Sequence, residues 1–175
     1  MATMIATKNA KLESWKRDVL QQALDAAERA AADVADCPRA LVPVTVAQFL
    51  LESGWGQAGM GDAHNYFGIK ARDGEPSVTK STTEYVNGKP VRVDARFRAY
   101  GSMAECFADH AQLICARTRP NGAKIYADAL AHPDDPCAFA RALTGVYATD
   151  PQYGEKLVSI MRDRGLLESF GFPLA

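Results

Sequence analysis

The stretch from Pro43 to Ser53 is apolar at nearly every position, and it restricts the possible fold more than any other feature. Pro43 suits the first turn of a helix, and Gly54 suits the position just beyond its end. A helix that is apolar nearly all round is buried rather than lying on the surface. Gln48 and Glu52 are the only polar residues well inside it, and because they are four apart they lie on the same side. The segment therefore predicts a buried helix that ends in a carboxylate.

Further helices are expected on both sides of this segment. Apolar residues recur every three or four positions from about Asn9 to Val34, which indicates one helix before it. Ser102-Met-Ala-Glu105 is a capping box that predicts the start of another. Asp135-Pro136 and Asp150-Pro151 each combine an N-cap with a first-turn proline, and each pair predicts the start of a helix. The helix that begins at Asp150-Pro151 is expected to be the last of the chain.

A hairpin is expected between these helices. The runs 78–86 and 90–97 are rich in β-prone residues and are separated by Asn87-Gly88, which is the strongest short-range hairpin signal. Pro90 fits only a strand end or an edge, so we expect the hairpin to project from the body. The chain is therefore predicted to be mainly α (α+β), a single domain in which an N-terminal helix (1–40) packs on the remainder of the chain (41–175).

Composition excludes several classes of function. With 20 basic and 21 acidic side chains the net charge is −1, which argues against nucleic acid as a partner, because that binding relies on an excess of Lys and Arg. No stretch is long and apolar enough to span a membrane, and residues 1–10 lack the pattern of a secretory signal. We therefore expect synthesis in the cytoplasm, with the four cysteines present as free thiols. We expect no cofactor. We also expect no metal, since the spacing of Cys and His does not resemble that of a metal site.

Glu52 is the residue with the clearest chemical signal. A carboxylate is unfavourable at the negative end of a helix dipole and costly to bury unpaired. Both effects favour the protonated form and would raise its pKa. A carboxylic acid that stays protonated near neutral pH can protonate a leaving oxygen, so Glu52 is a candidate general acid.

A partner for this acid is harder to identify from the residues alone. Glycoside hydrolysis normally uses two carboxylates that flank the scissile bond. Glu84 lies in the predicted hairpin, and Asp62, Asp94 and Asp150 are the other candidates, although Asp150 is more simply explained as a helix cap. Tyr147 and Tyr153 could either line a sugar site or anchor a helix in the core.

Five motifs in order resemble glycoside hydrolase family 73, which contains peptidoglycan glucosaminidases of the autolysin and flagellar-rod type. They are Ala47-Gln-Phe-Leu-Leu-Glu-Ser-Gly-Trp-Gly56, Asn65-Tyr-Phe-Gly-Ile-Lys70, Thr83-Glu-Tyr85, Phe97-Arg-Ala-Tyr100 and Tyr147-Ala-Thr-Asp-Pro-Gln-Tyr153. The resemblance implies a lysozyme-like helical fold with a β-hairpin lobe beside a substrate groove. It also implies hydrolysis of the β-1,4 bond between N-acetylglucosamine and N-acetylmuramic acid.

The resemblance also implies roles for particular residues. Glu52 matches the catalytic acid, Glu84 the hairpin carboxylate and Tyr147 a tyrosine that faces the acid. The implied substrate contacts are Gln48, Trp55, Asn65, Phe67, Lys70, Tyr100, Asp150 and Tyr153. The partner is then a peptidoglycan glycan strand, bound by a monomer.

Two other functions stay open at this point: a lytic transglycosylase, which needs one glutamate only, and a non-catalytic peptidoglycan-binding module. Delivery is open as well. A phage endolysin released by lysis, or an injected antibacterial effector with an immunity protein as partner, would act in the periplasm or cell wall. A domain of a longer chain would fit too.

Overall fold

The computed structural model describes residues 5, 7–58, 60–86 and 89–173, and it describes residues 83–86, 89 and 90 by their backbone alone. Its helices and strands are α2 (Ser14–Ala32), α3 (Leu41–Glu52), the short 3-10 helix η1 (Gly61–Ala63), β1 (Ser77–Val86), β2 (Lys89–Arg98), α4 (Met103–Cys115), α5 (Ala127–Leu130), α6 (Pro136–Ala142), α7 (Tyr153–Asp163) and α8 (Leu166–Ser169). The mainly helical α+β prediction with one hairpin is confirmed. No helix in the described ranges is long and apolar enough to cross a membrane.

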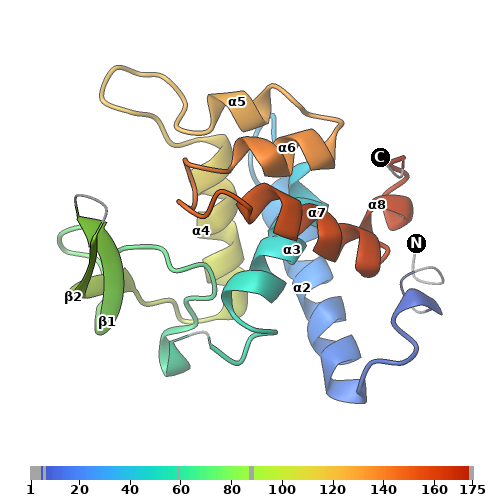
Figure 1. Cartoon of the computed structure of the whole chain (residues 1–175), viewed down its shortest axis with the longest axis horizontal. Coiled ribbons are helices and arrows are strands. Elements are labelled where there is room, and N and C mark those ends of the chain that lie inside the picture. Colours follow the sequence, from blue (N-terminus) through green and yellow to red (C-terminus); the bar gives the residue numbers. More distant parts are fainter. Residues whose placement is uncertain (1–4, 6, 59, 87–88, 174–175) are drawn as a thin grey trace.

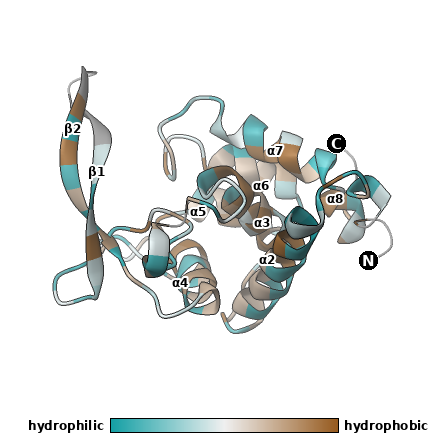
Figure 2. Ribbon diagram, turned by 90° about the horizontal axis from the view of Figure 1, so that it is seen from below, coloured by the Kyte–Doolittle hydropathy of each residue, from teal (hydrophilic) through white to brown (hydrophobic). Residues whose placement is uncertain are grey.

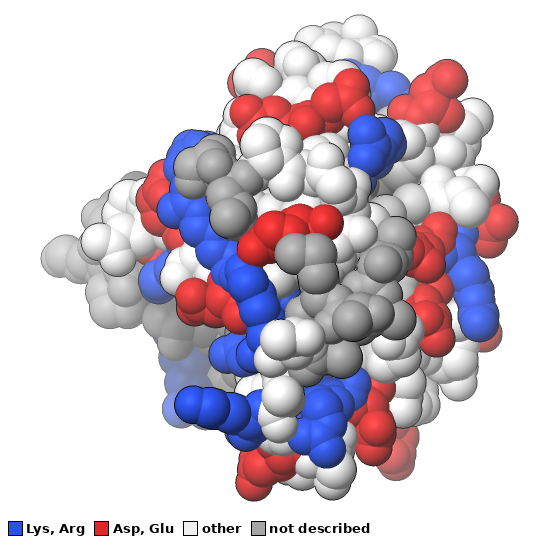
Figure 3. All heavy atoms as spheres, turned by 90° about the vertical axis from the view of Figure 1, so that its right-hand side faces the viewer, with Lys and Arg blue, Asp and Glu red and all other residues white. Residues whose placement is uncertain are grey.

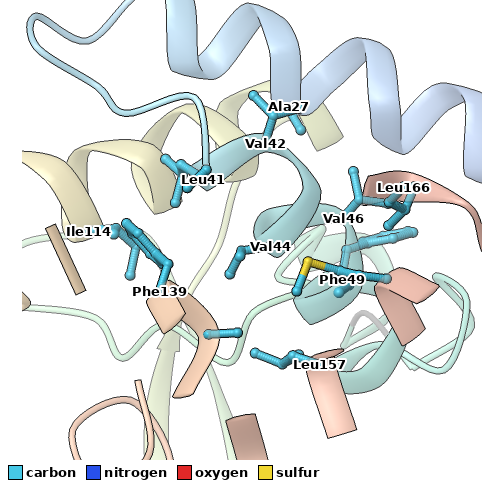
Figure 4. Close-up of a cluster of buried hydrophobic side chains, with 14 of the residues drawn as sticks. Ala27, Leu41, Val42, Val44, Val46, Phe49, Ile114, Phe139, Leu157 and Leu166 are labelled. Atoms are coloured by element: carbon cyan, nitrogen blue, oxygen red, sulfur yellow. The ribbon is translucent and has the colours of Figure 1, made fainter. Parts of the chain in front are cut away.

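Helix α3 lies at the centre of the helical body (Figure 1). Every residue from Leu41 to Leu50 is buried, as the apolar composition of the segment predicts. Helices α2, α6 and α7 pack against it. Figure 4 shows side chains from these helices and from α8 converging on α3, among them Ala27, Phe139, Leu157 and Leu166. The acid at the end of α3 is therefore attached to a helix that is buried in the core.

Local capping signals place most of the helix starts correctly. The Ser102 hydroxyl accepts a hydrogen bond from Glu105 N at 3.2 Å, so α4 begins where the capping box predicts. The Asp135 carboxylate accepts from Cys137 N and Ala138 N at 3.0 and 2.9 Å, and Pro136 follows it in the first turn of α6.

Three predicted helix boundaries are wrong. The first long helix begins at Ser14 rather than near Asn9. Helix α7 begins at Tyr153 rather than directly after Asp150, because Asp150 accepts a hydrogen bond from Gln152 N and so stabilises the turn before the helix. Helix α7 is also not the last helix, since Gly165 adopts a left-handed conformation (φ 70°) and α8 follows it.

Strands β1 and β2 form the predicted antiparallel hairpin, in register from Ser77 opposite Arg98 to Val86 opposite Lys89. The hairpin stands away from the helices (Figure 2). Its base is tied to the segment before it, because Ala71 N donates to Arg96 O at 3.0 Å and Arg98 N donates to Ile69 O at 2.9 Å. The turn predicted at Asn87-Gly88 lies outside the described residues.

Candidate active site

A sharp reversal of the chain just after α3 leaves Glu52 accessible. The Ser53 hydroxyl donates to Phe49 O at 2.5 Å and accepts from Gly56 N at 2.7 Å, which closes the helix end. Gly54, Trp55 and Gly56 all have positive φ, so three consecutive left-handed residues turn the chain away. Glu52 is consequently an exposed residue at the end of an otherwise buried helix.

The environment of the Glu52 carboxyl favours its protonated form. Burial among the surrounding protein atoms raises the pKa, and a hydrogen bond from Tyr153 opposes part of this effect. The Tyr153 hydroxyl donates to Glu52 Oε1 at 2.8 Å. The direction of the shift is the one expected from the sequence. The exposed edge of the residue adds what a general acid also needs, which is access for a ligand.

Gln48 lies behind this pair and does not face solvent. Its Nε2 donates to the Tyr153 hydroxyl at 3.0 Å, one helical turn before Glu52 on the same side of α3. Gln48 is fully buried and Tyr153 is 3% exposed, so neither offers much surface to a glycan. Burial and the nearby Glu52 raise the pKa of Tyr153, which keeps its hydroxyl proton available for the carboxylate. We therefore expect Gln48 to position Tyr153, and Tyr153 to position the acid.

Tyr147 lies beside Tyr153 but directs its hydroxyl elsewhere. The two rings stack with centroids 5.7 Å apart and planes inclined by 12°. The Tyr147 hydroxyl donates to Phe67 O at 3.0 Å, and burial raises its pKa well above the usual value. In this structure the tyrosine that hydrogen-bonds the acid is Tyr153, whereas the resemblance implied Tyr147 for the facing position.

Asn65 holds together the loop that supports these tyrosines. It is 1% exposed. Its Nδ2 donates to Ile69 O at 2.8 Å and to Arg98 O at 2.7 Å, and its Oδ1 accepts from Ile69 N at 3.0 Å. The side chain thus links the 65–70 loop to the end of β2, and its amide is occupied by backbone groups. We expect it to shape the wall of the site rather than to contact a substrate.

His110 is a residue of this site whose role was not foreseen. It is fully buried on α4, where the helical spacing of the sequence placed it on the apolar face. Its ring stacks on Phe67 at 4.0 Å and lies 6.0 Å from the ring of Tyr147. Burial lowers its pKa to about 3, so the imidazole is neutral at physiological pH. His110 therefore acts as a support beneath the loop that carries Phe67.

The other residues predicted to contact substrate occupy varied positions. Phe67 is buried. Tyr100 is buried and donates to Asp109 Oδ2 at 2.7 Å, so its hydroxyl is also used internally. Asp150 is paired with Lys156 at 2.5 Å. Lys70 is exposed at the base of the hairpin, opposite Phe97.

Trp55 lies on the side of the turn that faces helix α2. Its ring is 5.9 Å from Lys16 Nζ and 5.3 Å from the Arg164 guanidinium, and it lines a hollow together with Trp15. The structure thus brings Glu52, Tyr153, Gln48 and Tyr147 together, and it separates Trp55 from them.

An open hollow lies between the hairpin and the chain that follows Glu52. It is lined by Gln57, Ala58, Met60, Gly61, Lys80, Ser81, Thr82 and Phe97. Glu84 lies further along β1, opposite Val91, and the orientation of its side chain lies outside the described part. A ligand held in this hollow would therefore run between the body and the hairpin that carries Glu84.

Charges of both signs lie on the described surface (Figure 3). Figure 3 shows Lys, Arg, Asp and Glu interspersed on the face that carries the chain ends, as a net charge of −1 leads one to expect. Within the described ranges no three His, Cys, Asp or Glu side chains are grouped as a metal site would require.

Comparison with known proteins gives a consistent result. The family model Glucosaminidase, described as mannosyl-glycoprotein endo-beta-N-acetylglucosaminidase, matches residues 28–166. A probable N-acetylmuramidase of Lactococcus lactis subsp. lactis is 40% identical over 136 residues, which cover 76% of this chain and 31% of that protein. The exo-glucosaminidase LytG of Bacillus subtilis is 36% identical over 129 residues, covering 73% of this chain and 45% of LytG.

A solved structure gives the same match in three dimensions. The catalytic domain of the autolysin Auto from Listeria monocytogenes superposes with a TM-score of 0.68 at 27% identity, covering 90% of this chain and 89% of that one. The chain thus corresponds to a whole catalytic domain of known structure, and it spans less than half the length of these two curated relatives.

Proposed function

Because the chain belongs to the glucosaminidase family of glycoside hydrolases, we propose that it hydrolyses the glycan strands of bacterial peptidoglycan with Glu52 as the general acid. One observation carries the proposal. An accessible carboxyl with a raised pKa is held by a tyrosine hydroxyl at 2.8 Å and lies at the end of the most deeply buried helix. A positioned and accessible carboxyl with a raised pKa is what protonation of a glycosidic oxygen requires.

The first step breaks the bond between the anomeric carbon and the glycosidic oxygen. Glu52 gives its proton to that oxygen, so that the departing sugar leaves as a neutral alcohol and positive charge develops at the anomeric carbon. The hydrogen bond from Tyr153 then stabilises the carboxylate that Glu52 has become. Gln48 keeps the tyrosine hydroxyl in place throughout.

Glu84 is the proposed second carboxylate. It either activates the attacking water or orients the acetamido group of the substrate as that group attacks the anomeric carbon, which is a known variant of the two-carboxylate mechanism. Glu84 lies on a hairpin that projects from the body (Figure 2). Closure of the hairpin over a bound strand would bring its carboxylate toward the anomeric carbon.

The bond that we propose is the β-1,4 linkage that follows N-acetylglucosamine. The names of the relatives point to both linkages, since one is called a probable N-acetylmuramidase and another an exo-glucosaminidase. Mass spectrometry of digested peptidoglycan tests the choice directly. We expect new reducing N-acetylglucosamine ends. Reducing muramic ends would instead indicate muramidase cleavage, anhydro-muramic ends a transglycosylase, and strand binding without any product a binding module.

The proposed substrate determines the compartment of action, because peptidoglycan lies outside the inner membrane. We propose action in the periplasm or cell wall by a monomer that reaches it through phage lysis, through injection or as part of a longer protein. Delivery by injection would require an immunity protein in the producing cell. Co-purification from producing cells, with peptidoglycan digestion as the readout of inhibition, would identify such a partner.

A further inference from the structure

Two cysteines that are far apart in the sequence meet at the junction of three helices. Cys37 lies in the connection between α2 and α3, and Cys115 is the last residue of α4. They are 78 positions apart, and their Sγ atoms are 2.8 Å from each other. Both are free thiols in this structure. We propose that Cys37 and Cys115 form a disulfide when the protein meets an oxidising compartment, cross-linking the α2–α3 connection to the end of α4.

The surroundings make this pair more suitable for oxidation than the other two cysteines. Cys37 is partly exposed, so a disulfide oxidant can reach it, whereas Cys115 is 6% exposed behind it. Cys106 is fully buried inside α4, and Cys137 is 2% exposed on α6. The Sγ atoms of Cys37 and Cys115 are already 2.8 Å apart, so they need to approach by less than about 1 Å to reach the length of a disulfide bond.

The pKa values of the two thiols are also shifted in opposite directions, which suits disulfide exchange. The hydrogen bond from Cys115 lowers the pKa of Cys37, which favours Cys37 as the attacking thiolate. The same contact, together with burial, raises the pKa of Cys115, so that Cys115 keeps its proton until the second step. An accessible thiolate beside a protonated resolving thiol is the usual arrangement of a reactive pair.

The exchange proceeds in two balanced steps with a disulfide oxidant, either a dithiol oxidoreductase in its oxidised form or glutathione disulfide. The Cys37 thiolate attacks one sulfur of the oxidant, which forms a mixed disulfide and releases the other sulfur as a thiolate. Cys115 then loses its proton and attacks the Cys37 sulfur, which releases the second sulfur of the oxidant. The chain loses two electrons and two protons, and the oxidant is reduced to two thiols.

The cross-link would close a long loop that contains the proposed acid. Helix α3, Glu52 and the whole hairpin lie between Cys37 and Cys115 in the sequence. Closing so long a loop restricts the unfolded chain strongly, and we expect the melting temperature to rise by about 10 °C in a protein of this size. The consequence is a chain that folds with free thiols where reductants keep them reduced and gains stability after it leaves that compartment.

The test uses the purified full chain and needs no substrate, so its outcome does not depend on the proposed activity. The chain is incubated with glutathione disulfide, its remaining thiols are counted after denaturation, and its peptides are mapped by mass spectrometry without reduction. We expect two of the four thiols to disappear, a peptide pair joining Cys37 to Cys115, and a melting temperature that falls again when reductant is added.

Matched variants complete the design. Cys37→Ser should keep its remaining three thiols and lose the dependence of its melting temperature on reductant, whereas Cys106→Ser should behave as the unchanged chain does. Retention of all four thiols in the unchanged chain, a stable glutathione adduct on Cys37, or a linked pair involving Cys106 or Cys137 would overturn the proposal. Because peptide mapping is done on the unchanged chain, the result does not depend on the folding of any variant.

Discussion

The substitution Asn65→Ala tests whether the 65–70 loop is held from within or shaped by contact with substrate. The amide of Asn65 makes three hydrogen bonds to backbone groups at 2.7 to 3.0 Å while the residue is 1% exposed. The Ile69 carbonyl keeps a second partner, because Arg98 N also donates to it. Alanine would remove the Oδ1 acceptor of Ile69 N–H and the Nδ2 donor to Arg98 O, because Asn65 supplies both.

The expected cost follows from those two groups. An unsatisfied buried polar group costs about 1–3 kcal/mol, so the free energy of unfolding should fall by about 3 kcal/mol. This is a large part of the roughly 5–15 kcal/mol that stabilises a typical domain. For a chain of this length the melting temperature should fall by about 6–12 °C.

The assay is thermal and urea unfolding, with peptidoglycan turnover measured below the melting range of each variant. Asn121→Ala is the matched control, because Asn121 Oδ1 accepts an exposed hydrogen bond from Ala123 N and its loss should change stability by less than about 1 kcal/mol. If Asn65→Ala kept the stability of the unchanged chain and lost only kcat/KM, the structural role assigned to Asn65 would be refuted and a substrate contact favoured.

Three further substitutions test the remaining contacts. Tyr153→Phe removes the hydrogen bond that lowers the pKa of Glu52, so the acid should stay protonated to higher pH; the alkaline limb of the kcat/KM profile should move upward, and a downward move would contradict this. Tyr147→Phe should lower the free energy of unfolding by about 1 kcal/mol through loss of the bond to Phe67 O, which urea unfolding would measure. Gly154→Ala would place a Cβ 2.5 Å from Arg141 Cα and force α6 and α7 apart; a loss of about 2–3 kcal/mol is expected, and unchanged thermal stability would argue against this packing.

Local features of the fold could be read from the sequence because each depends on neighbouring residues. The apolar composition of 43–53 predicts a buried helix whatever surrounds it, and Asn87-Gly88 between two β-prone runs predicts a hairpin in the same way. The helix that Asp150 was expected to start begins at Tyr153, because turn chemistry and helix capping use the same residue types.

Contacts across the fold could not be predicted. Glu52 was identified because a carboxylate that ends an apolar helix is unusual in itself, but its hydrogen-bond partner lies 101 positions away. The burial of Gln48 and Asn65 likewise depends on what packs over them, so both were expected to face substrate. No spacing rule links Cys37 to Cys115, which meet only because α4 ends beside the α2–α3 connection. The hydrogen bonds that position Glu52 and Tyr153 in the site therefore join residues that are far apart in the sequence.

The central claim, that Glu52 is the acid, is tested most directly by comparing three purified variants on peptidoglycan. Glu52→Gln keeps the size of the side chain and removes the transferable proton, Glu84→Gln alters the proposed second carboxylate, and Glu28→Gln changes an exposed residue of α2 as a control. Released reducing ends are measured with equal amounts of folded protein. We predict no turnover for Glu52→Gln, reduced turnover for Glu84→Gln and normal turnover for Glu28→Gln. Near-normal release of sugar fragments by folded Glu52→Gln protein would contradict the account.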